Sequence, residues 1–129
     1  MGKTERKDIY LCAECGNAVE AVTSGSPVPV CCGKRMEKAA AKTGDFSTEK
    51  HVPYIERDGR IVKVRVGKEA AHPMTPEHYI VFIEIEADGA IMRRYLQPGD
   101  APEARFETDA KDIVAREFCN LHKLWASGQ

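Results

Sequence analysis

The fold is first indicated by the stretch Tyr79-Ile80-Val81-Phe82-Ile83-Glu84-Ile85-Glu86, in which Tyr79, Val81, Ile83 and Ile85 alternate with a half-polar set. Alternation with a period of two is typical of a strand whose two faces meet different surroundings. Asp88-Gly89 follows and predicts a hairpin into a second strand over 91–96, because both central positions of a type I′ turn need positive φ. We therefore predict an antiparallel sheet here.

The same pattern recurs on both sides of this hairpin. Residues 61–66 read Ile-Val-Lys-Val-Arg-Val, with the valines on one face, and Asp58-Gly59 before them predicts another hairpin. Further strand candidates cover 104–106 and 112–118, although 110–112 also allows a helical turn. Short, regularly spaced strands with little helix favour an antiparallel β-sandwich. We predict an all-β fold.

Residues 8–38 differ from the rest of the chain because they are rich in cysteine and poor in apolar side chains. A segment below about 40 residues rarely folds alone without metals, disulfides or oligomerisation. Gly16 and Gly33 each follow a cysteine and suit tight turns that point backbone amides at thiolate sulfur. We predict a metal-pinned domain of two or three short strands over 1–38, and a second domain over 39–129 that begins with a linker.

Composition excludes several classes of protein. The chain has 129 residues, with 19 Lys+Arg against 20 Asp+Glu, and this even balance argues against a nucleic-acid partner. No segment approaches the roughly 20 apolar residues of a membrane helix, and the charged N-terminus does not resemble a secretory signal. We expect a cytoplasmic location. The chain has 5 cysteines, which is an odd number. Because disulfides are disfavoured in the cytoplasm, these cysteines favour metal binding or redox chemistry, and disulfides are the alternative for exported or oxidised material.

The first group of candidate metal ligands is Cys12, Cys15, Cys31 and Cys32. The first two form a Cys-x-x-Cys pair, which occurs in zinc ribbons, redox motifs and iron sites. The second two are adjacent, whereas a zinc ribbon repeats Cys-x-x-Cys. Neighbouring backbone positions point to opposite sides, so we expect a distorted tetrahedron. Zinc and iron both accept four thiolates, and the spacing does not distinguish them.

The second group contains every histidine of the chain and the remaining cysteine: His51, His72, His78, Cys119 and His122. Neutral imidazole and thiolate are good donors for first-row metals. A lone histidine is more often a hydrogen-bonded surface or core residue than a ligand. Here all four histidines lie in short elements flanked by proline or cysteine, so we predict a second metal site.

Taken together, the two groups resemble the superoxide reductase family in its two-domain form, known as desulfoferrodoxin. The matching stretches are Cys12-x-x-Cys15 with Cys31-Cys32-Gly33, then Glu49-Lys50-His51-Val52-Pro53, His72-Pro73-Met74-x-x-x-His78-Tyr79-Ile80 and Cys119-Asn120-x-His122. They cover essentially the whole chain. The resemblance implies a desulforedoxin-like N-terminal domain and an immunoglobulin-like catalytic β-sandwich. The chain departs from the family at Phe82, where tryptophan is expected, and at Lys123-Leu124-Trp125, which replaces a commoner Gly-His-Trp.

The resemblance also implies a ligand set and a reaction. One iron would be held by the four cysteines, where zinc is an alternative occupant. A second iron would take His51, His72, His78 and His122 as equatorial ligands and Cys119 as the axial ligand, with the opposite position open. Superoxide, one electron and two protons would give hydrogen peroxide, a detoxification under oxidative stress. A rubredoxin-like donor would restore the ferrous state, and the protein would be a homodimer.

Two residues beside His51 have roles under the same resemblance. Lys50 would attract anionic superoxide and help deliver a proton through water, and Glu49 would ligate ferric iron in the resting state. Taken without the motif, a Glu-Lys pair is an ordinary solvated surface.

Three other functions remain open on the sequence alone. The first is an electron-transfer protein that uses only the four-cysteine site. The second is a zinc-stabilised binding module with histidines on its loops. The third is a different mononuclear iron enzyme, against which the donor set argues, because most such oxygenases use two histidines and a carboxylate.

Overall fold

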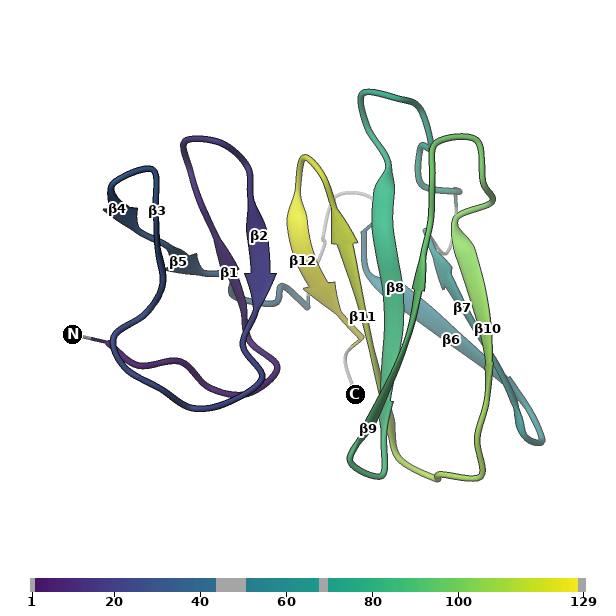
Figure 1. The fold of residues 1–129 in the computed structure, drawn as a ribbon. Coiled ribbons are helices and arrows are strands. Elements are labelled where there is room, and N and C mark those ends of the chain that lie inside the picture. Colours follow the sequence, from purple (N-terminus) through teal and green to yellow (C-terminus); the bar gives the residue numbers. More distant parts are fainter. Residues whose placement is uncertain (1, 44–50, 68–69, 128–129) are drawn as a thin grey trace. The chain divides into compact units, whose positions relative to one another are not determined.

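The protein is described by a computed structural model that covers residues 2–43, 51–67 and 70–127. Within these ranges the secondary structure consists of β-strands, with no helix (Figure 1), which confirms the all-β prediction. The chain forms two compact units, Met1–Ala40 and Ala41–Gln129. Among the described residues, no helix has the length and apolar character that crossing a membrane requires.

The first unit is built from five very short strands. Strand β1 (Ile9–Leu11) pairs antiparallel with β2 (Ala18–Glu20) and with β5 (Glu37–Lys38). Strands β3 (Val30–Cys31) and β4 (Lys34–Arg35) form a separate hairpin. The hydrophobic cluster of this unit has Tyr10, Cys12 and Met36 as its buried members, and Ile9 and Ala39 are buried as well. So few buried side chains provide little hydrophobic stabilisation, which agrees with the expectation that a metal is needed here.

The second unit is a sandwich of two antiparallel sheets. One sheet has the order β10-β7-β6 and the other has the order β12-β11-β8-β9 (Figure 1). The first sheet contains β6 (Pro53–Asp58), β7 (Ile61–Val66) and β10 (Glu103–Glu107). The second contains β8 (Ile80–Ala87), β9 (Ala90–Tyr95), β11 (Ile113–Cys119) and β12 (Lys123–Ala126). This is the predicted β-sandwich.

The core of the sandwich lies between the inner faces of the two sheets. The three valines of β7 are at most 1% exposed, and Ile83 and Ile85 of β8 are fully buried against them. The opposite face of β8 is not simply polar. Glu84 is 1% exposed there, and its carboxylate accepts hydrogen bonds from the guanidinium groups of Arg93 and Arg116. These charge-assisted bonds offset the desolvation of the carboxylate.

The two predicted hairpins differ in their outcome. Asp88 and Gly89 both have positive φ, 52° and 80°, and connect β8 to β9 as predicted. The predicted turn at Asp58-Gly59 is wrong by one residue, because Asp58 pairs with Ile61 and the turn residues are Gly59 and Arg60. Of these two turn residues only Gly59 has a positive φ, 63°. The turn therefore has positive φ at its first central position alone, and not at both central positions as a type I′ turn requires. Residues 110–112 form no helical turn.

Strand direction gathers three chain segments at one end of the sandwich. Strands β6 and β8 begin at this end, just after His51 and His78, and β11 ends there at Cys119. The pairing of β11 with β8 shifts register between Phe118 and Cys119. Such an irregularity re-aims a side chain at the end of a ladder. The predicted ligands of the second group therefore meet at one end of the sandwich.

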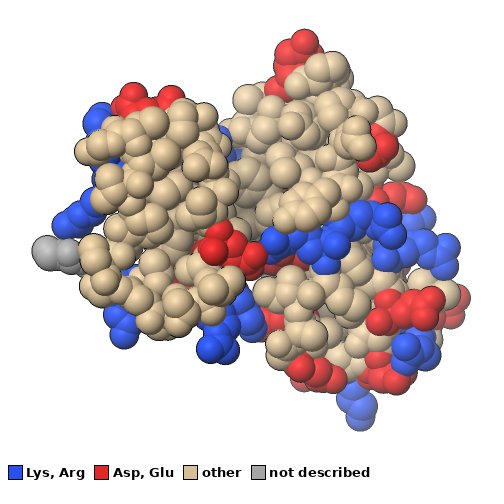
Figure 2. Space-filling view, viewed as in Figure 1, with Lys and Arg blue, Asp and Glu red and all other residues tan. Residues whose placement is uncertain are grey.

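The surface carries no face of a single charge in the view of Figure 2, where basic and acidic side chains are interspersed. This agrees with the near-equal counts of 19 basic and 20 acidic residues.

Candidate metal centres

The first unit brings its four cysteines together. One sulfur from each of Cys12, Cys15, Cys31 and Cys32 lies within 4.8 Å of the others. The Cys15 and Cys31 sulfurs are 3.6 Å apart, and those of Cys31 and Cys32 are 4.0 Å apart. Four thiolates around a metal at 2.3 Å would be separated by roughly 3.8 Å. The sulfurs therefore have the spacing of a tetrathiolate site, and all five cysteines of the chain are free thiols.

A tight turn explains how two adjacent cysteines face one centre. Cys31 pairs with Lys34, so Cys32 and Gly33 are the central residues of the β3–β4 hairpin. Both have positive φ, 53° and 75°. A cysteine in this left-handed region is uncommon, and it turns the second sulfur to the same side as the first. The expected opposition of neighbouring side chains is thereby avoided.

The thiols of this cluster differ in acidity. Hydrogen bonds from the backbone amides of Cys15 and Glu14 lower the pKa of Cys12 to about 7, against the opposing effect of burial. Hydrogen bonding to Cys15 and Cys12 raises the pKa of Cys32 to about 12. The cluster thus carries its first negative charge on Cys12, while Cys31 and Cys32, whose pKa values are raised, keep their protons. A cation that binds here displaces those protons, so its affinity rises with pH.

The second unit brings the four histidines and Cys119 into one cluster. The donor atoms of His51, His78 and His122 lie within 4.8 Å of one another, as do those of His72, His78 and Cys119. His78 belongs to both groups. The Nε2 atom of His51 lies 2.9 Å from Nδ1 of His122, and the Cys119 sulfur lies 3.9 Å from the same Nδ1. Nitrogen and sulfur donors from three separate segments therefore converge on one small volume.

His72 shows that this cluster suits a metal ion. Its side chain is only 2% exposed, and Nδ1 lies 2.7 Å from the carbonyl oxygen of Pro73, to which it must donate its proton. The proton on Nδ1 leaves Nε2 as a lone-pair acceptor. This Nε2 is buried and has no hydrogen-bond partner among the described residues. Burial, with smaller effects from the other histidines, lowers the pKa of His72 to about 4, so the ring is neutral and ready to ligate.

Cys119 forms the buried side of the cluster. Its side chain is fully buried, and this burial raises the pKa of its thiol. Hydrogen bonds from the backbone amides of His122 and Leu121 oppose that rise, as does the charge of Lys123. His122, by contrast, is exposed. The cluster is therefore open on the histidine side and closed behind the sulfur.

Two residues to which the sequence assigned no role hold the segments of the candidate ligands in place. The Asn120 side chain accepts from the Tyr79 amide at 2.9 Å and donates to the Glu77 carbonyl at 3.0 Å, on either side of His78. The indole Nε1 of Trp125 donates to the His122 carbonyl at 3.0 Å. The signals were the asparagine inside the Cys-Asn-x-His motif and the single tryptophan of the chain. Residue type did not reveal what either contacts.

Glu49 and Lys50, predicted as catalytic neighbours of His51, lie outside the described residues.

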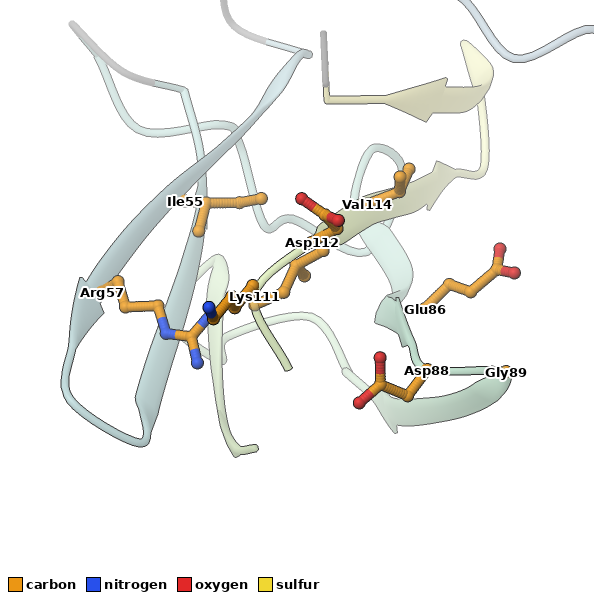
Figure 3. Close-up of a pocket in the computed structure, with 9 residues that line it drawn as sticks. Ile55, Arg57, Glu86, Asp88, Gly89, Lys111, Asp112 and Val114 are labelled. Carbon is orange, nitrogen blue, oxygen red and sulfur yellow. The ribbon is translucent and has the colours of Figure 1, made fainter. Parts of the chain in front are cut away.

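A surface hollow of about 680 Å³ lies at the opposite end of the sandwich, by the β8–β9 turn and the start of β11 (Figure 3). Its mixed charges include Arg57, whose guanidinium already donates to the carbonyls of Gly59, Thr108 and Ala110. It is lined by no histidine or cysteine; its residues are Ile55, Arg57, Glu86, Asp88, Gly89, Lys111, Asp112, Ile113 and Val114. The histidine and cysteine donors of this unit therefore lie in the histidine cluster and not in this hollow.

Comparisons with known proteins agree with this two-part organisation. Residues 43–128 match the family model described as desulfoferrodoxin, and residues 4–39 match the model of the desulfoferrodoxin N-terminal domain. The chain is 48% identical over 125 residues to a desulfoferrodoxin homolog of Archaeoglobus fulgidus, covering 97% of this chain and 99% of the other. It is 40% identical over 108 residues to a superoxide reductase of Thermococcus kodakarensis, covering 70% of this chain and 94% of the other. A crystal structure of the superoxide reductase from Treponema pallidum has a TM-score of 0.73 at 32% identity, covering 93% of this chain and 96% of that one.

Proposed function

The chain belongs to the desulfoferrodoxin family, and from that premise we propose that it is a superoxide reductase whose catalytic iron is held by His51, His72, His78, His122 and Cys119. On this proposal the N-terminal domain is residues 1–38 and the catalytic domain is residues 39–129. The observation that carries the proposal is the buried, unprotonated Nε2 of His72, which faces other nitrogen donors and has no hydrogen-bond partner among the described residues.

The donor set suits a redox metal better than a structural one. A structural zinc site is usually closed by four ligands, whereas a catalytic site keeps one position for substrate. Here one sulfur lies on the buried side and His122 is exposed. When bound, ferrous iron supplies one electron to superoxide, which leaves with two protons as hydrogen peroxide.

The chain's own residues prepare this site in three ways. Burial raises the pKa of the Cys119 thiol, and hydrogen bonds from the backbone amides of His122 and Leu121 lessen that rise and stabilise the thiolate that a metal would bind. Burial keeps His72 neutral by lowering its pKa, and the Pro73 carbonyl, which accepts the Nδ1 proton, fixes the tautomer. Asn120 and Trp125 hold the ligand segments through hydrogen bonds to the backbone. These outer contacts fix ring orientation and ligand basicity.

Lys50 and Glu49 complete the proposal from the sequence motif. Lys50 would raise the local concentration of the superoxide anion and pass a proton through water. Glu49 would ligate the ferric ion at rest.

The four-cysteine site is proposed to hold a second iron, with zinc as a competitor for the same thiolates. Cys15 and Cys32 are exposed, whereas Cys12 is buried. Exposed sulfurs favour electron exchange with a partner, so we assign this site the role of a relay in addition to its stabilising role. A rubredoxin-like carrier as donor, a homodimer and a cytoplasmic location complete the proposal.

The deciding experiment measures iron and zinc per chain, and then the products formed from superoxide. We expect iron in the histidine site and hydrogen peroxide without evolved dioxygen. Cys119→Ser should abolish the reaction. Cys15→Ser, which alters only the first site, should retain the reaction of the ferrous protein but slow its re-reduction. Zinc alone, resistant to anaerobic iron reconstitution, would instead support a zinc-stabilised binding module, and evolved dioxygen would indicate a dismutase.

A further inference from the structure

The first residue of β12 has a backbone conformation that its residue type disfavours. Lys123 has a φ of +69° and lies opposite Cys119 in the β11–β12 ladder. This left-handed region favours glycine, because a Cβ there crowds the following carbonyl. A lysine at this position is explained only if its side chain contributes something that glycine lacks.

The Lys123 side chain reaches back over the loop that carries the ligands. Its Nζ donates a hydrogen bond to the backbone carbonyl of Asn120 at 3.1 Å. That carbonyl belongs to the same peptide group as the N–H of Leu121. The Leu121 amide in turn is one of the two amides whose hydrogen bonds act on the Cys119 sulfur. One peptide group therefore lies between the Lys123 ammonium and the Cys119 sulfur.

We propose that Lys123 tunes the Cys119 sulfur through the Asn120–Leu121 peptide group. An ammonium at the carbonyl oxygen polarises the peptide and draws electron density from its N–H. Hydrogen bonds in such a chain strengthen one another, so Leu121 becomes a better donor to sulfur. The sulfur then donates less charge to a bound metal, and the lower oxidation state is favoured. The inference rests on the proposed role of Cys119 as a ligand.

The loop does not depend on Lys123 for its shape. The Asn120 amide donates to the Tyr79 carbonyl at 3.1 Å, and the Asn120 side chain makes two further bonds to the Glu77–Tyr79 segment. Trp125 caps the His122 carbonyl. Removing the ammonium should therefore change the electronic properties of the sulfur and leave the fold of the loop unchanged.

The test compares three variants. Lys123→Met keeps the length of the side chain and removes both its charge and its donor. Lys123→Arg keeps both. Lys111→Met makes the same charge change at an exposed site at the opposite end of the sandwich. The readouts are the Leu121 amide proton shift in zinc-loaded protein, the iron–sulfur stretching frequency by resonance Raman, and the midpoint potential of the histidine-site iron.

In Lys123→Met we expect an upfield shift of the Leu121 amide proton, a higher iron–sulfur stretching frequency and a lower midpoint potential. Lys123→Arg should restore all three, and Lys111→Met should leave them unchanged. The proposal is overturned if Lys123→Met matches the parent protein, or if Lys111→Met lowers the potential as much. If the histidine site takes no iron, the proposed function fails first. The Leu121 shift in zinc-loaded protein still decides whether the peptide relay exists.

Discussion

The imidazole of His51 stacks on the indole of Trp125, with 4.8 Å between ring centroids and 18° between ring planes. The same indole donates its N–H to the carbonyl of His122, and the Lys42 ammonium lies 5.1 Å from its ring centroid. Trp125 thus connects the segments of two candidate ligands, His51 and His122, which are 71 residues apart in the chain. It fixes the plane of one ring and the backbone of the other.

This relationship predicts that Trp125→Leu weakens metal binding at the histidine site by about 10- to 100-fold, the usual effect of losing an outer-shell partner. Trp125→Phe keeps an aromatic ring for His51 but loses the donor to His122, so its loss should be smaller. Competition with a chelator of known affinity measures both. Equal affinities for all three proteins would show that Trp125 only fills space.

Asn120→Ala should destabilise the second unit. The substitution removes the side-chain partner of the part-buried Tyr79 amide and of the exposed Glu77 carbonyl, and each lost hydrogen bond should cost about 0.5–1.5 kcal/mol. Urea unfolding of zinc-loaded protein measures the change in the free energy of unfolding. Asn17→Ala, at an exposed position in the first unit, is the matched control. Unchanged hydrogen exchange at the Tyr79 amide in Asn120→Ala would contradict the contact.

Glu117 predicts a pH dependence of stability. Its side chain is fully buried, neither carboxylate oxygen has a hydrogen-bond partner among the described residues, and burial raises its pKa well above the usual value. The stability associated with the protonated form is therefore complete below the unfolded-state pKa and is lost as pH rises toward the folded-state pKa. The loss is about 1.4 kcal/mol per pH unit over that window.

Glu117→Gln removes this titration, so it should be more stable than the parent protein at neutral pH and similar to it near pH 4. Glu107→Gln, at an exposed position on β10, is the control and should follow the parent at every pH. Urea unfolding over this pH range provides the comparison. A Glu117→Gln variant with the same pH profile as the parent would place the titration elsewhere.

Removing the metal from the four-cysteine site should unfold the first unit and leave the sandwich folded. The hydrophobic cluster of the first unit has Tyr10, Cys12 and Met36 as its buried members, whereas the sandwich buries half of β7 and most of β8. Hydrogen exchange after chelation should show lost protection at Tyr10 and retained protection at Val64. Cys15→Ser should give the same pattern without a chelator. Retained protection at Tyr10 would show that the first unit folds without its metal.

Lys50→Ala should slow the reaction with superoxide and weaken its dependence on ionic strength, because a cation near the site attracts the anion and salt screens that attraction. Lys111→Ala, which removes a lysine at the far end of the sandwich, is the control for net charge. Pulse radiolysis at several salt concentrations measures the bimolecular rate. An unchanged rate in Lys50→Ala would remove this residue from the mechanism.

Much of the fold was predictable because strand patterns are local. The alternating valines of 61–66 became the buried face of β7, and Asp88-Gly89 became the predicted turn. The turn at Asp58-Gly59 was misplaced by one residue, because an Asp-Gly pair is also compatible with a turn in which glycine is the first central residue. Packing between the two strands decides which of these two turn positions is adopted. Strand β12 was not predicted, since four residues show too little periodicity.

The candidate sites divide in the same way. The residues able to bind metals were identifiable from their type and grouping, and their role as ligands stays a prediction. Asn120, Trp125 and Lys123 could not be assigned a role, because each acts on a backbone group that no sequence pattern reveals. The same holds for Glu117, whose burial beside Cys119 depends on the strand face that it occupies.

The sequence by itself determined which donors this protein has and which stretches form strands, because ligand chemistry belongs to the residue type and alternation belongs to the local backbone. Only the tertiary structure decided which donors meet. The positive φ of Cys32 brings two adjacent sulfurs to one side, and the register shift at Cys119 ends the ladder beside His78. The turn at Cys32 is fixed by the β3–β4 hairpin of the first unit, and the register shift depends on pairing between distant strands that is settled when the sandwich packs.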